Sequence, residues 1–578
     1  MDGRTKNLSF YSFGSVLARR IVSSYRNLGF GALAVILFSC SPDSPNSFPE
    51  STKAELSQKA SQAAEGWERS HRYMNAWLEY ADPTSGLIPR NLDGGLGQDV
   101  WNARDCAADN YPFLVLTSYF TDQEKYQGVM REILATEMRL TSRVKSLPDT
   151  YSFSKKDFKD DSLDMDRIVF GTSEYIKDGL LPLTEWLGHS PWYDRMITML
   201  HDLDEHVDVA GVQGQEFGKA AKAEVNGELL QVLSRMYWMT GEETLLEWAQ
   251  QIGDYYLLSA GSPLSHFDYL RLRDHGCELV AGLCELYATI HFEHPEKKMM
   301  YQKPLYTLLD HILEHGRNED GLFYNAINPQ TGMVVDSGVS DGWGYMLNGY
   351  YTVYMVDSVQ AYKDAVMKVF QNLHRYQAFN WENLGADGYA DAIEGAINLY
   401  NRLPDPKAAE WIDSEIQVMW SMQDSAWRQN AQQWKGQGII EGWYGDGNFA
   451  RTSIMYGLWK TQGTYLRPWN RSLRWAATTS QLNGSFDQSD TLYVTIDSPT
   501  EWEGRLFFDG ARHSSAMHLP MDWPRINQFP EWFVVRPEKD YSLSINGESS
   551  VFSGEDLLAG LQITLPAEET VEIVVVQK

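Results

Sequence analysis

The sequence predicts a mainly α-helical protein: an (α/α)6–7 helical-hairpin toroid followed by a small C-terminal β-sandwich. Between about residues 52 and 465, a polar or glycine-rich loop leads seven times into an apolar helix rich in small residues. An amphipathic helix follows in most cases, and such a repeat is typical of stacked helical hairpins. After about residue 470 the pattern changes to short strands separated by turn residues.

The seven apolar helices are expected to form an inner ring, because a helix that is apolar on every face is buried on every side. They begin in the segments 103–120, 171–187, 220–238, 273–290, 340–356, 387–401 and 445–459. The amphipathic helices would pack outside them as antiparallel partners. The helix at about 52–80 has no partner before it and the last inner helix has none after it. Pairing these two closes the ring; an open superhelix is the alternative.

The strands of the predicted sandwich are LYVTIDS, GRLFFDG, EWFVVRP, YSLSING and VEIVVVQK. Glycine, proline, asparagine and aspartate turns separate them. The last strand alternates little, so we expect it to be buried on both faces. We assign residues 52–468 to the toroid, as the catalytic domain, and residues 469–578 to the sandwich.

The N-terminus resembles a bacterial lipoprotein signal. Three arginines precede the apolar run LGFGALAVILF, which is too short to span a bilayer comfortably, and Ser39 and Cys40 follow it. We therefore predict a signal peptide over residues 1–40 with Cys40 as the lipid-bearing residue, and a tether over 41–51. Ser41 after the cysteine favours the outer membrane, on its periplasmic side or at the cell surface.

Composition excludes some functions and constrains others. The formal charge is −29 and the pI about 4.8, so the surface would repel a phosphate backbone and nucleic-acid binding is excluded. An anionic polysaccharide would need a local patch of arginine or lysine. The 20 Trp and 31 Tyr residues include candidate stacking platforms for sugars. Beyond Cys40, the cysteines Cys106, Cys277 and Cys284 suggest no disulfide framework.

Unusual polar residues gather where the inner helices begin. In a hairpin toroid all inner helices run the same way, so the loops entering them share one rim. Asp105 and Asp109 form one like-charge pair at i,i+4, and Asp274/Glu278 and Asp387/Asp391 form two more. Each residue alone fits a helix cap, but each pair costs about 0.2–0.5 kcal/mol and would raise the pKa of one carboxyl group, as general acid catalysis requires.

Metal and nucleotide sites are not indicated. His201 and His206 are five residues apart, about 140° around a helix, so they cannot chelate a metal as HExxH does. His291 and His294 have a spacing that could chelate a metal, but the sequence offers no third ligand beside them. No Walker or dinucleotide glycine motif occurs in a strand–turn–helix context. The sequence therefore predicts no metal and no cofactor.

Three stretches carry a family resemblance: WNARDCAADNYPF, RLRDHGCELVAGLCELYA and SDGWGYMLNGYYTVY. Within the toroidal glycosidases and polysaccharide lyases, they are most similar to uronate-active hydrolases of the glycoside hydrolase family 154 type. The resemblance to unsaturated glucuronyl hydrolases is looser, because their tryptophan-glycine-arginine-glycine motif is absent here. The resemblance implies an exported hydrolase of uronic-acid-containing oligo- or polysaccharides, glucuronidase-like in its activity. A uronate lyase or an oligosaccharide dehydratase for ulvan-type substrates is the alternative, and a non-catalytic glycan-capture lipoprotein is a second.

The two chemistries need different residues on the same rim. Hydrolysis needs two carboxyl groups that flank the glycosidic oxygen; the candidates are Asp105, Asp274 and Asp341, with Asp446 in reserve. Elimination needs a base and an acid, for which His275 with Tyr345 or Tyr324 are the candidates, and a cationic clamp from Arg273 or Arg451. The predicted substrate-binding residues are Arg104, Asp109, Arg273, Trp343, Trp443, Tyr444, Asp446 and Arg451.

Overall fold

The structure is a computed structural model. It describes residues 48 to 578 except 49, 93–95, 209–210, 213–218, 260–261, 384, 426–446 and 481–490. The predicted signal peptide, Cys40 and most of the tether lie outside the described residues. None of the helices that the structure describes is both long enough and apolar enough to cross a membrane.

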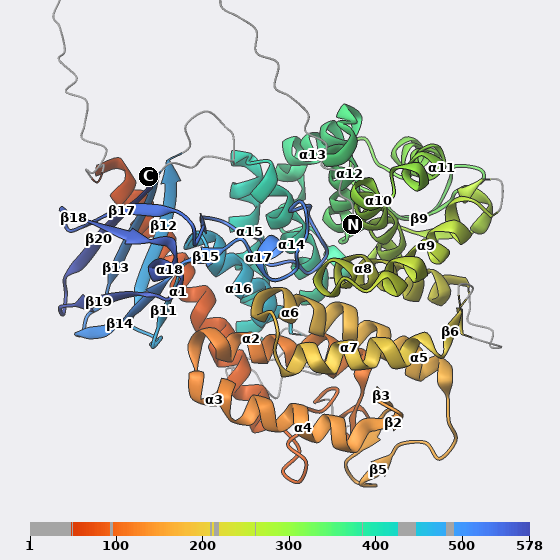
Figure 1. The fold of residues 1–578 in the computed structure, drawn as a ribbon, viewed down its shortest axis with the longest axis horizontal. Coiled ribbons are helices and arrows are strands. Elements are labelled where there is room, and N and C mark those ends of the chain that lie inside the picture. The colour runs from red at the N-terminus through yellow and green to blue at the C-terminus, as the bar shows by residue number, and fades with distance from the viewer. Residues whose placement is uncertain are drawn as a thin grey trace, which may run out of the picture. The chain divides into compact units, whose positions relative to one another are not determined.

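Seven inner helical segments form a closed ring in the described part of the chain (Figure 1). In chain order they are η2 (Ala103–Asn110) with α2 (Tyr111–Thr121); α5 (Met165–Glu174) with η3 (Tyr175–Leu180) and α6 (Leu181–Leu187); α8 (Lys219–Thr240); α10 (Glu278–Glu293); α12 (Trp343–Asp357); α14 (Ala386–Arg402); and α16 (Asn448–Lys460). Each segment contacts the next, and α16 returns to α2. Every residue of α16 is buried, which explains its small and apolar composition.

The outer helices each pack against an inner one. They are α1 (Glu50–Glu79), α3 (Gln123–Gln127) with α4 (Val129–Thr141), α7 (Pro191–Asp204), α9 (Glu243–Leu257), α11 (Pro295–His315), α13 (Gln360–Asn372) and α15 (Pro406–Ser425). In α4 the residues Met130, Ile133, Leu134 and Glu137 are buried, which is one stripe of an amphipathic helix. Helix α1 packs along α16, so the pairing of the first and last helices closes the ring as predicted, with seven hairpins.

Short elements carry the chain into the inner helices. They are η1 (Leu96–Asp99); the strands β1 (Val100–Trp101), β4 (Tyr151–Ser152) and β5 (Asp157–Phe158); the hairpins β2 (Ser142–Val144) with β3 (Leu147–Pro148) and β6 (Val207–Asp208) with β7 (Gly211–Val212); the sheet of β8 (Leu270–Arg271), β9 (Tyr324–Asn328) and β10 (Met333–Val339); and η4 (Pro263–His266), η5 (Asp274–Cys277), η6 (Leu373–Tyr376) and η7 (Trp381–Asn383). Strand β8 and η5 lead into α10, β10 leads towards α12, and η7 leads into α14.

The C-terminal strands form two sheets. One has the order β12 (Arg474–Ser480), β13 (Thr491–Asp497), β20 (Thr570–Gln577), β17 (Asp540–Ile545), β18 (Glu548–Ser553); the other has β11 (Tyr465–Arg467), β14 (Trp502–Phe507), β19 (Leu561–Leu565). Short β15 (Asp509–Gly510) and β16 (Val534–Val535) pair in parallel, and α17 (Arg512–Ser515) and α18 (Gly554–Leu558) complete the fold. Ile573, Val574 and Val575 are buried in succession, as expected for β20.

The sandwich packs on the first outer helix. Leu56 and Ala60 of α1 form an apolar cluster with Ala476 of β12, and Figure 1 shows the blue strands beside the red α1. Helices give way to strands between Lys460 and Tyr465, yet residues 46–578 form one compact unit. The division at residues 468 and 469 therefore stays a prediction. Cys106, Cys277 and Cys284 are buried free thiols.

Candidate active site

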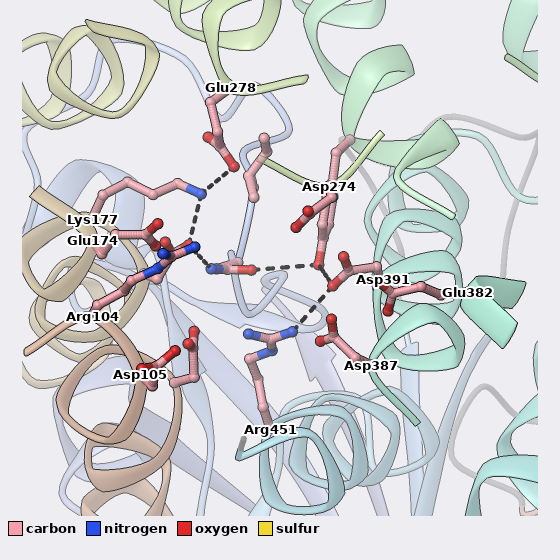
Figure 2. Close-up of a pocket in the computed structure, with 15 residues that line it drawn as sticks. Arg104, Asp105, Glu174, Lys177, Asp274, Glu278, Glu382, Asp387, Asp391 and Arg451 are labelled. Carbon is pink, nitrogen blue, oxygen red and sulfur yellow. Dashed lines mark hydrogen bonds and ion pairs between the residues drawn. The ribbon is translucent and has the colours of Figure 1, made fainter. Parts of the chain in front are cut away.

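A cavity of about 190 Å³ opens among the loops and first turns of the inner helices (Figure 2). Most of its lining is charged, with carboxyl groups in excess. The lining residues are Arg104, Asp105, Asp109, Glu174, Lys177, Asp178, Asp274, Glu278, Tyr345, Glu382, Asp387, Asp391, Arg451, Ile526 and Asn527. The first thirteen come from six of the seven inner segments or the turns that lead into them, and the last two come from the sandwich. The site is therefore built at one end of the ring.

Two of the inner segments are π-helical where they meet the cavity. Helix η2 carries Asp105 and Asp109, and η3 carries Lys177 and Asp178. A π-helical turn spaces its hydrogen bonds five residues apart, is rare in proteins and frequently occurs at functional sites. With Arg104, also on η2, the two π-helices bring five charged side chains to one cavity.

Two cavity acids have strained backbones. Asp274 has φ 46° and Glu382 has φ 40°, both in the left-handed region that non-glycine residues rarely adopt. Such a conformation costs on the order of 1–3 kcal/mol and clusters at active sites. Because both strained residues present carboxyl groups to the same cavity, the strain marks the cavity as a functional site.

One wall of the cavity is a cluster of mutually close carboxyl groups. Burial, together with Asp387, Asp341 and Asp274, raises the pKa of Glu382 to about 8 against the opposing effect of Arg273. Burial and Asp387 hold the pKa of Asp391 well above its usual range. Arg273 donates to Glu382 Oε1 at 2.7 Å, which fixes the side chain. Glu382 therefore keeps its proton at neutral pH and has the property of a general acid.

The opposite wall presents a carboxylate in an ion pair. Asp105 accepts from Arg90 Nε at 2.7 Å and from the amide of Asn102. Beside it, the guanidinium of Arg104 lies over the ring of Phe170, 4.6 Å from its centroid. Figure 2 shows Arg104 and Asp105 on the side of the cavity away from Glu382 and Asp387. The two walls thus place a proton-bearing acid and a carboxylate on opposite sides of one small space.

Arg104 is distinct among the cavity cations. Lys177 donates to Asp178 at 2.7 Å and to Glu278 at 2.5 Å, and Arg451 is bound to Asp391 and Glu394. Among the described residues, Arg104 has neither a hydrogen bond nor an ion pair, and it is exposed. Burial alone would lower the pKa of Arg104, but Glu174 and nearby aspartates raise it. Arg104 remains positively charged and open to an incoming anion.

A larger groove adjoins the cavity at this wall. It measures about 630 Å³ and shares Arg104 and Asp105 with the cavity. Three further cations line it: Arg90, Lys159 and Arg167. Four carboxyl groups line it as well, those of Asp105, Asp149, Asp166 and Glu224, so the cations and acids of its lining are equal in number. The groove can hold the remainder of a substrate whose reacting end enters the cavity.

The structure brings many of the predicted residues together. Asp105, Asp109, Asp274, Tyr345, Arg104 and Arg451 line the cavity. Asp341 is only 4 % exposed and lies behind the acidic wall, within electrostatic range of Arg273, Asp387 and Asp274. The side chain of His275 and the residues Trp443, Tyr444 and Asp446 lie outside the described residues.

Trp343 was wrongly predicted to bind sugar. It is completely buried and packs edge-on against Trp411 of α15, with ring centroids 6.1 Å apart. At the first residue of α12 the side chain turns towards the outer helix instead of the cavity. Its aromatic surface serves hairpin packing.

Sequence reasoning missed Glu382 as a candidate. It lies in the loop before α14, five residues ahead of Asp387, where the helical pattern had not yet begun. The only sequence signal is position, because this loop enters an inner helix like the other acidic loops. Ile526 and Asn527 were also missed, since nothing in a strand-rich segment predicts contact with the ring.

Two groups of side chains have ligand atoms within 4.8 Å of one another in the described part of the chain: Glu174, Glu224 and Glu228, and His513, Asp522 and Glu531. Arg104 lies in electrostatic range of the first group, and Arg402 and Arg525 bind Asp522 in the second. Arg402 and Arg525 balance the charge of Asp522, and burial together with Glu228 holds the pKa of Glu174 well above its usual range, which favours its protonated form. We therefore assign no metal to either group.

The acidic wall predicts a pH dependence of stability. Burial, together with Asp387 and Asp274, raises the pKa of Asp341 to about 6 against the opposing effect of Arg273. Between about pH 4 and pH 6 the folded protein holds a proton that the unfolded chain releases, so this contribution to stability is lost as pH rises through that window. Asp341→Asn should remove the loss. We expect the Tm of the variant relative to the native protein to increase from pH 4 to pH 6 and then stay constant; a pH-independent difference would contradict the assignment.

No family model and no curated protein matches the sequence. Solved structures of similar fold include a glycoside hydrolase family 76 mannosidase from Bacteroides thetaiotaomicron, 14% identical over 68% of this chain and 98% of that chain, with a TM-score of 0.38. The unsaturated glucuronyl hydrolase from Bacillus sp. GL1 is 12% identical over 51% and 86%, with a TM-score of 0.33. A sugar epimerase from a ruminal bacterium is 11% identical over 54% and 87%, with a TM-score of 0.37. At these values the likenesses carry no argument about the activity of this chain.

Proposed function

We propose that the protein is an exported glycoside hydrolase that acts on uronic-acid-containing oligo- or polysaccharides. The observation that carries the proposal is the pairing of Glu382, with its pKa of about 8, and the carboxylate of Asp105 across one cavity. Hydrolysis of a glycosidic bond needs one protonated and one ionised carboxyl group. The resemblance of WNARDCAADNYPF and its companions to family 154 type hydrolases points the same way.

In this geometry the carboxyl groups of Glu382 and Asp105 would have different roles in hydrolysis. With a sugar ring in the cavity, Glu382 donates its proton to the glycosidic oxygen as the bond breaks, so the leaving sugar departs as an alcohol. On the other side of the ring Asp105 stabilises the positive charge that develops at the anomeric carbon and either attacks it or activates a water molecule. Arg273 positions Glu382 through its 2.7 Å contact.

The uronate part of the proposal depends on Arg104. A sugar carboxylate entering a cavity with this many carboxyl groups needs a cation that is not already bound. Arg104 meets that need, because guanidinium groups bind carboxylates in a bidentate manner and this one is exposed. The groove beside it would receive further residues of the saccharide chain.

Arg104→Gln tests this specificity. We expect the variant to lose on the order of 10- to 100-fold in kcat/KM on glucuronides, since a charge-assisted bond is worth about 1.5–3 kcal/mol, and to change little on the matching glucosides. The measurement compares kcat/KM for aryl glucuronides and glucosides of both anomeric forms, with Arg131→Gln on α4 as a control outside the cavity. Equal losses of kcat/KM on glucuronides and glucosides would show that Arg104 does not bind the sugar carboxylate.

A specific observation favours hydrolysis over elimination. Tyr345, the candidate acid for a lyase or dehydratase, has its hydroxyl 3.1 Å from Asp391 Oδ1 and 3.2 Å from Glu394 Oε2. Burial and these two carboxyl groups raise its pKa well above the usual range. A tyrosine in this state gives up its proton poorly.

Export through the signal over residues 1–40, lipidation at Cys40 and attachment to the outer membrane belong to the proposal and depend on the sequence alone.

A further inference from the structure

A long irregular segment of the sandwich leaves its sheets and packs on the ring. Residues 511–533 connect β15 to β16 and contain only one short helix, α17. Loops of this length usually lie on the surface, and long ones are typically functional. This one is largely buried: Met517, Leu519, Trp523, Arg525, Ile526, Gln528 and Phe529 are each at most 2 % exposed. We call residues 511–533 the floor segment.

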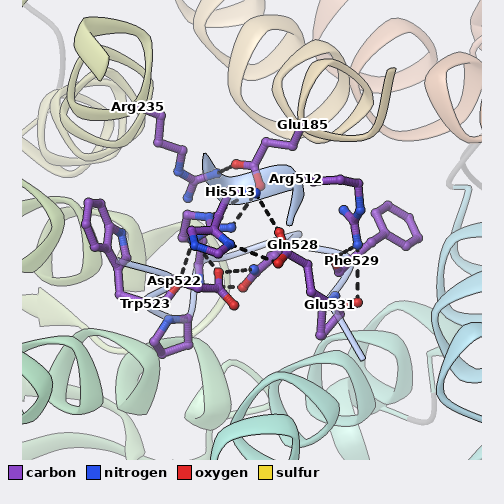
Figure 3. A network of polar contacts seen from close by, with 12 residues as sticks. Glu185, Arg235, Arg512, His513, Asp522, Trp523, Gln528, Phe529 and Glu531 are labelled. Carbon is purple, nitrogen blue, oxygen red and sulfur yellow. Dashed lines mark hydrogen bonds and ion pairs between the residues drawn. The ribbon is translucent and has the colours of Figure 1, made fainter. Parts of the chain in front are cut away.

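Buried polar contacts fix the floor segment to several inner helices. Figure 3 shows its polar network close to Glu185 and Arg235 of the ring. Arg525 donates to Glu185 of α6 at 3.3 Å, and the indole of Trp523 donates to Glu285 of α10 at the same distance. Asn398 and Asn401 of α14 donate to the carbonyl groups of Gln528 and Glu531 at 3.1 and 2.7 Å. Because its anchors lie on opposite sides of the ring, the segment has one defined position against the cavity.

Asn527 at the tip of the floor segment reaches the cavity itself. Its amide nitrogen donates to Asp178 Oδ1 at 2.7 Å, and its amide oxygen lies 3.4 Å from the hydroxyl of Tyr345. The same Asp178 oxygen accepts from Lys177, and Tyr345 contacts Asp391. Asn527 has φ 59°, a conformation that asparagine tolerates better than most residues. Figure 2 shows this chain of contacts crossing the cavity from Lys177 to Arg451.

We propose that Asn527 is a positioning residue that ties the floor segment to the cavity: it holds Asp178 and Tyr345 and, through the contact of Tyr345 with Asp391, fixes the acidic wall from which Glu382 acts. This inference rests on the proposed function for its catalytic part. A side-chain amide suits the place because it donates to a carboxylate and accepts from a hydroxyl at the same time. The active site is then complete only when the sandwich contributes its floor segment.

Exchanging the side chains of Asn527 and Asp178 tests their contact by a stability measurement, with no activity assay. Asn527→Asp places a second carboxyl group against Asp178, and two buried carboxyl groups cannot both ionise without cost. We expect its Tm deficit to grow by about 2 °C or more between pH 4 and pH 8, and the double variant Asn527→Asp/Asp178→Asn to remove the pH-dependent part. A deficit that is independent of pH, or one that the double variant does not relieve, would overturn the contact.

Kinetics test the positioning role. Asn527→Gly keeps the left-handed backbone favourable and removes both contacts. We expect kcat to fall on the order of 10²-fold, as for a misplaced catalytic group, while KM stays within about threefold. His518→Gly is the matched control, because His518 is in the same segment, also has a positive φ of 56°, and is exposed; its kcat should not change.

The outcomes separate this inference from the proposed function. If the native protein hydrolyses glycosides and Asn527→Gly leaves kcat unchanged, the positioning role is wrong while the function stands. If the native protein hydrolyses no glycoside, the proposed function fails, and the pH-dependent Tm of the exchange variants alone decides whether Asn527 joins the sandwich to the cavity.

Discussion

Glu382→Gln is expected to lower kcat by about 10²–10⁴-fold, the contribution of a positioned general acid. Glutamine keeps the size of the side chain and its contact with Arg273 but cannot donate a proton to the glycosidic oxygen. The pKa of Glu382 near 8 also predicts that native activity falls as pH rises through about 8, because the acid must be protonated. The measurement is kcat against pH for the native protein and the variant.

Substrates with different leaving groups test the role of Glu382 as general acid more specifically. A substrate whose leaving group is already a good one, such as a dinitrophenyl glucuronide, needs little protonation, so the variant should lose far less on it than on an oligosaccharide. Glu415→Gln is the matched control: burial raises the pKa of Glu415 to about 7, but it lies on α15 and accepts from the backbone of Ala378. Equal losses on good and poor leaving groups would show that Glu382 is not the acid.

Asp105→Ala is expected to cause a loss of similar size by a different route. Without the Asp105 carboxylate, the group that attacks the anomeric carbon or activates water in the proposed mechanism is missing. Azide at high concentration fits the vacated space and can attack in its place, so it should restore part of the activity and yield a glycosyl azide. The measurement is the rate with and without azide, with the product identified by mass spectrometry.

A control distinguishes this role from loss of an ion pair. Asp254 on outer helix α9 is ion-paired with Lys297 at 2.6 Å, as Asp105 is with Arg90. Asp254→Asn should leave kcat unchanged. If azide does not rescue Asp105→Ala while azide rescues a variant of Asp274 or Asp387, the carboxylate has been assigned to the wrong side chain.

Much of the fold could be predicted because burial leaves a periodic signal. The apolar, small-residue composition of segments such as 445–459 predicted inner helices, and the unpaired helices at the two ends predicted a closed ring of six or seven hairpins, of which the described part of the chain has seven. The acidic rim followed from the common direction of the inner helices. Asp105, Asp274 and Tyr345 reached the cavity for that reason.

The parts of the site that the sequence did not predict depend on local backbone conformation and on contacts between segments far apart in the chain. The π-helices over Ala103–Asn110 and Tyr175–Leu180 shift side chains around the helix without changing the hydrophobic pattern. Glu382 reaches the cavity from the short turn η7, where its own backbone is left-handed, and the side chain of Trp343 packs on Trp411 of α15 instead of entering the cavity. Asn527 lies 349 residues from Asp178 in the chain, and no periodicity links the two.

The central claim is that this cavity hydrolyses a glycosidic bond, and the mass of the products formed in H₂¹⁸O tests it most directly. We expect uronate-containing oligosaccharides to gain one water for each bond cleaved, with ¹⁸O at the new anomeric carbon. Glu382→Gln should form this product far more slowly. Cleavage without ¹⁸O and with a new carbon–carbon double bond, or loss of water without cleavage, would contradict the claim and assign the cavity to elimination instead.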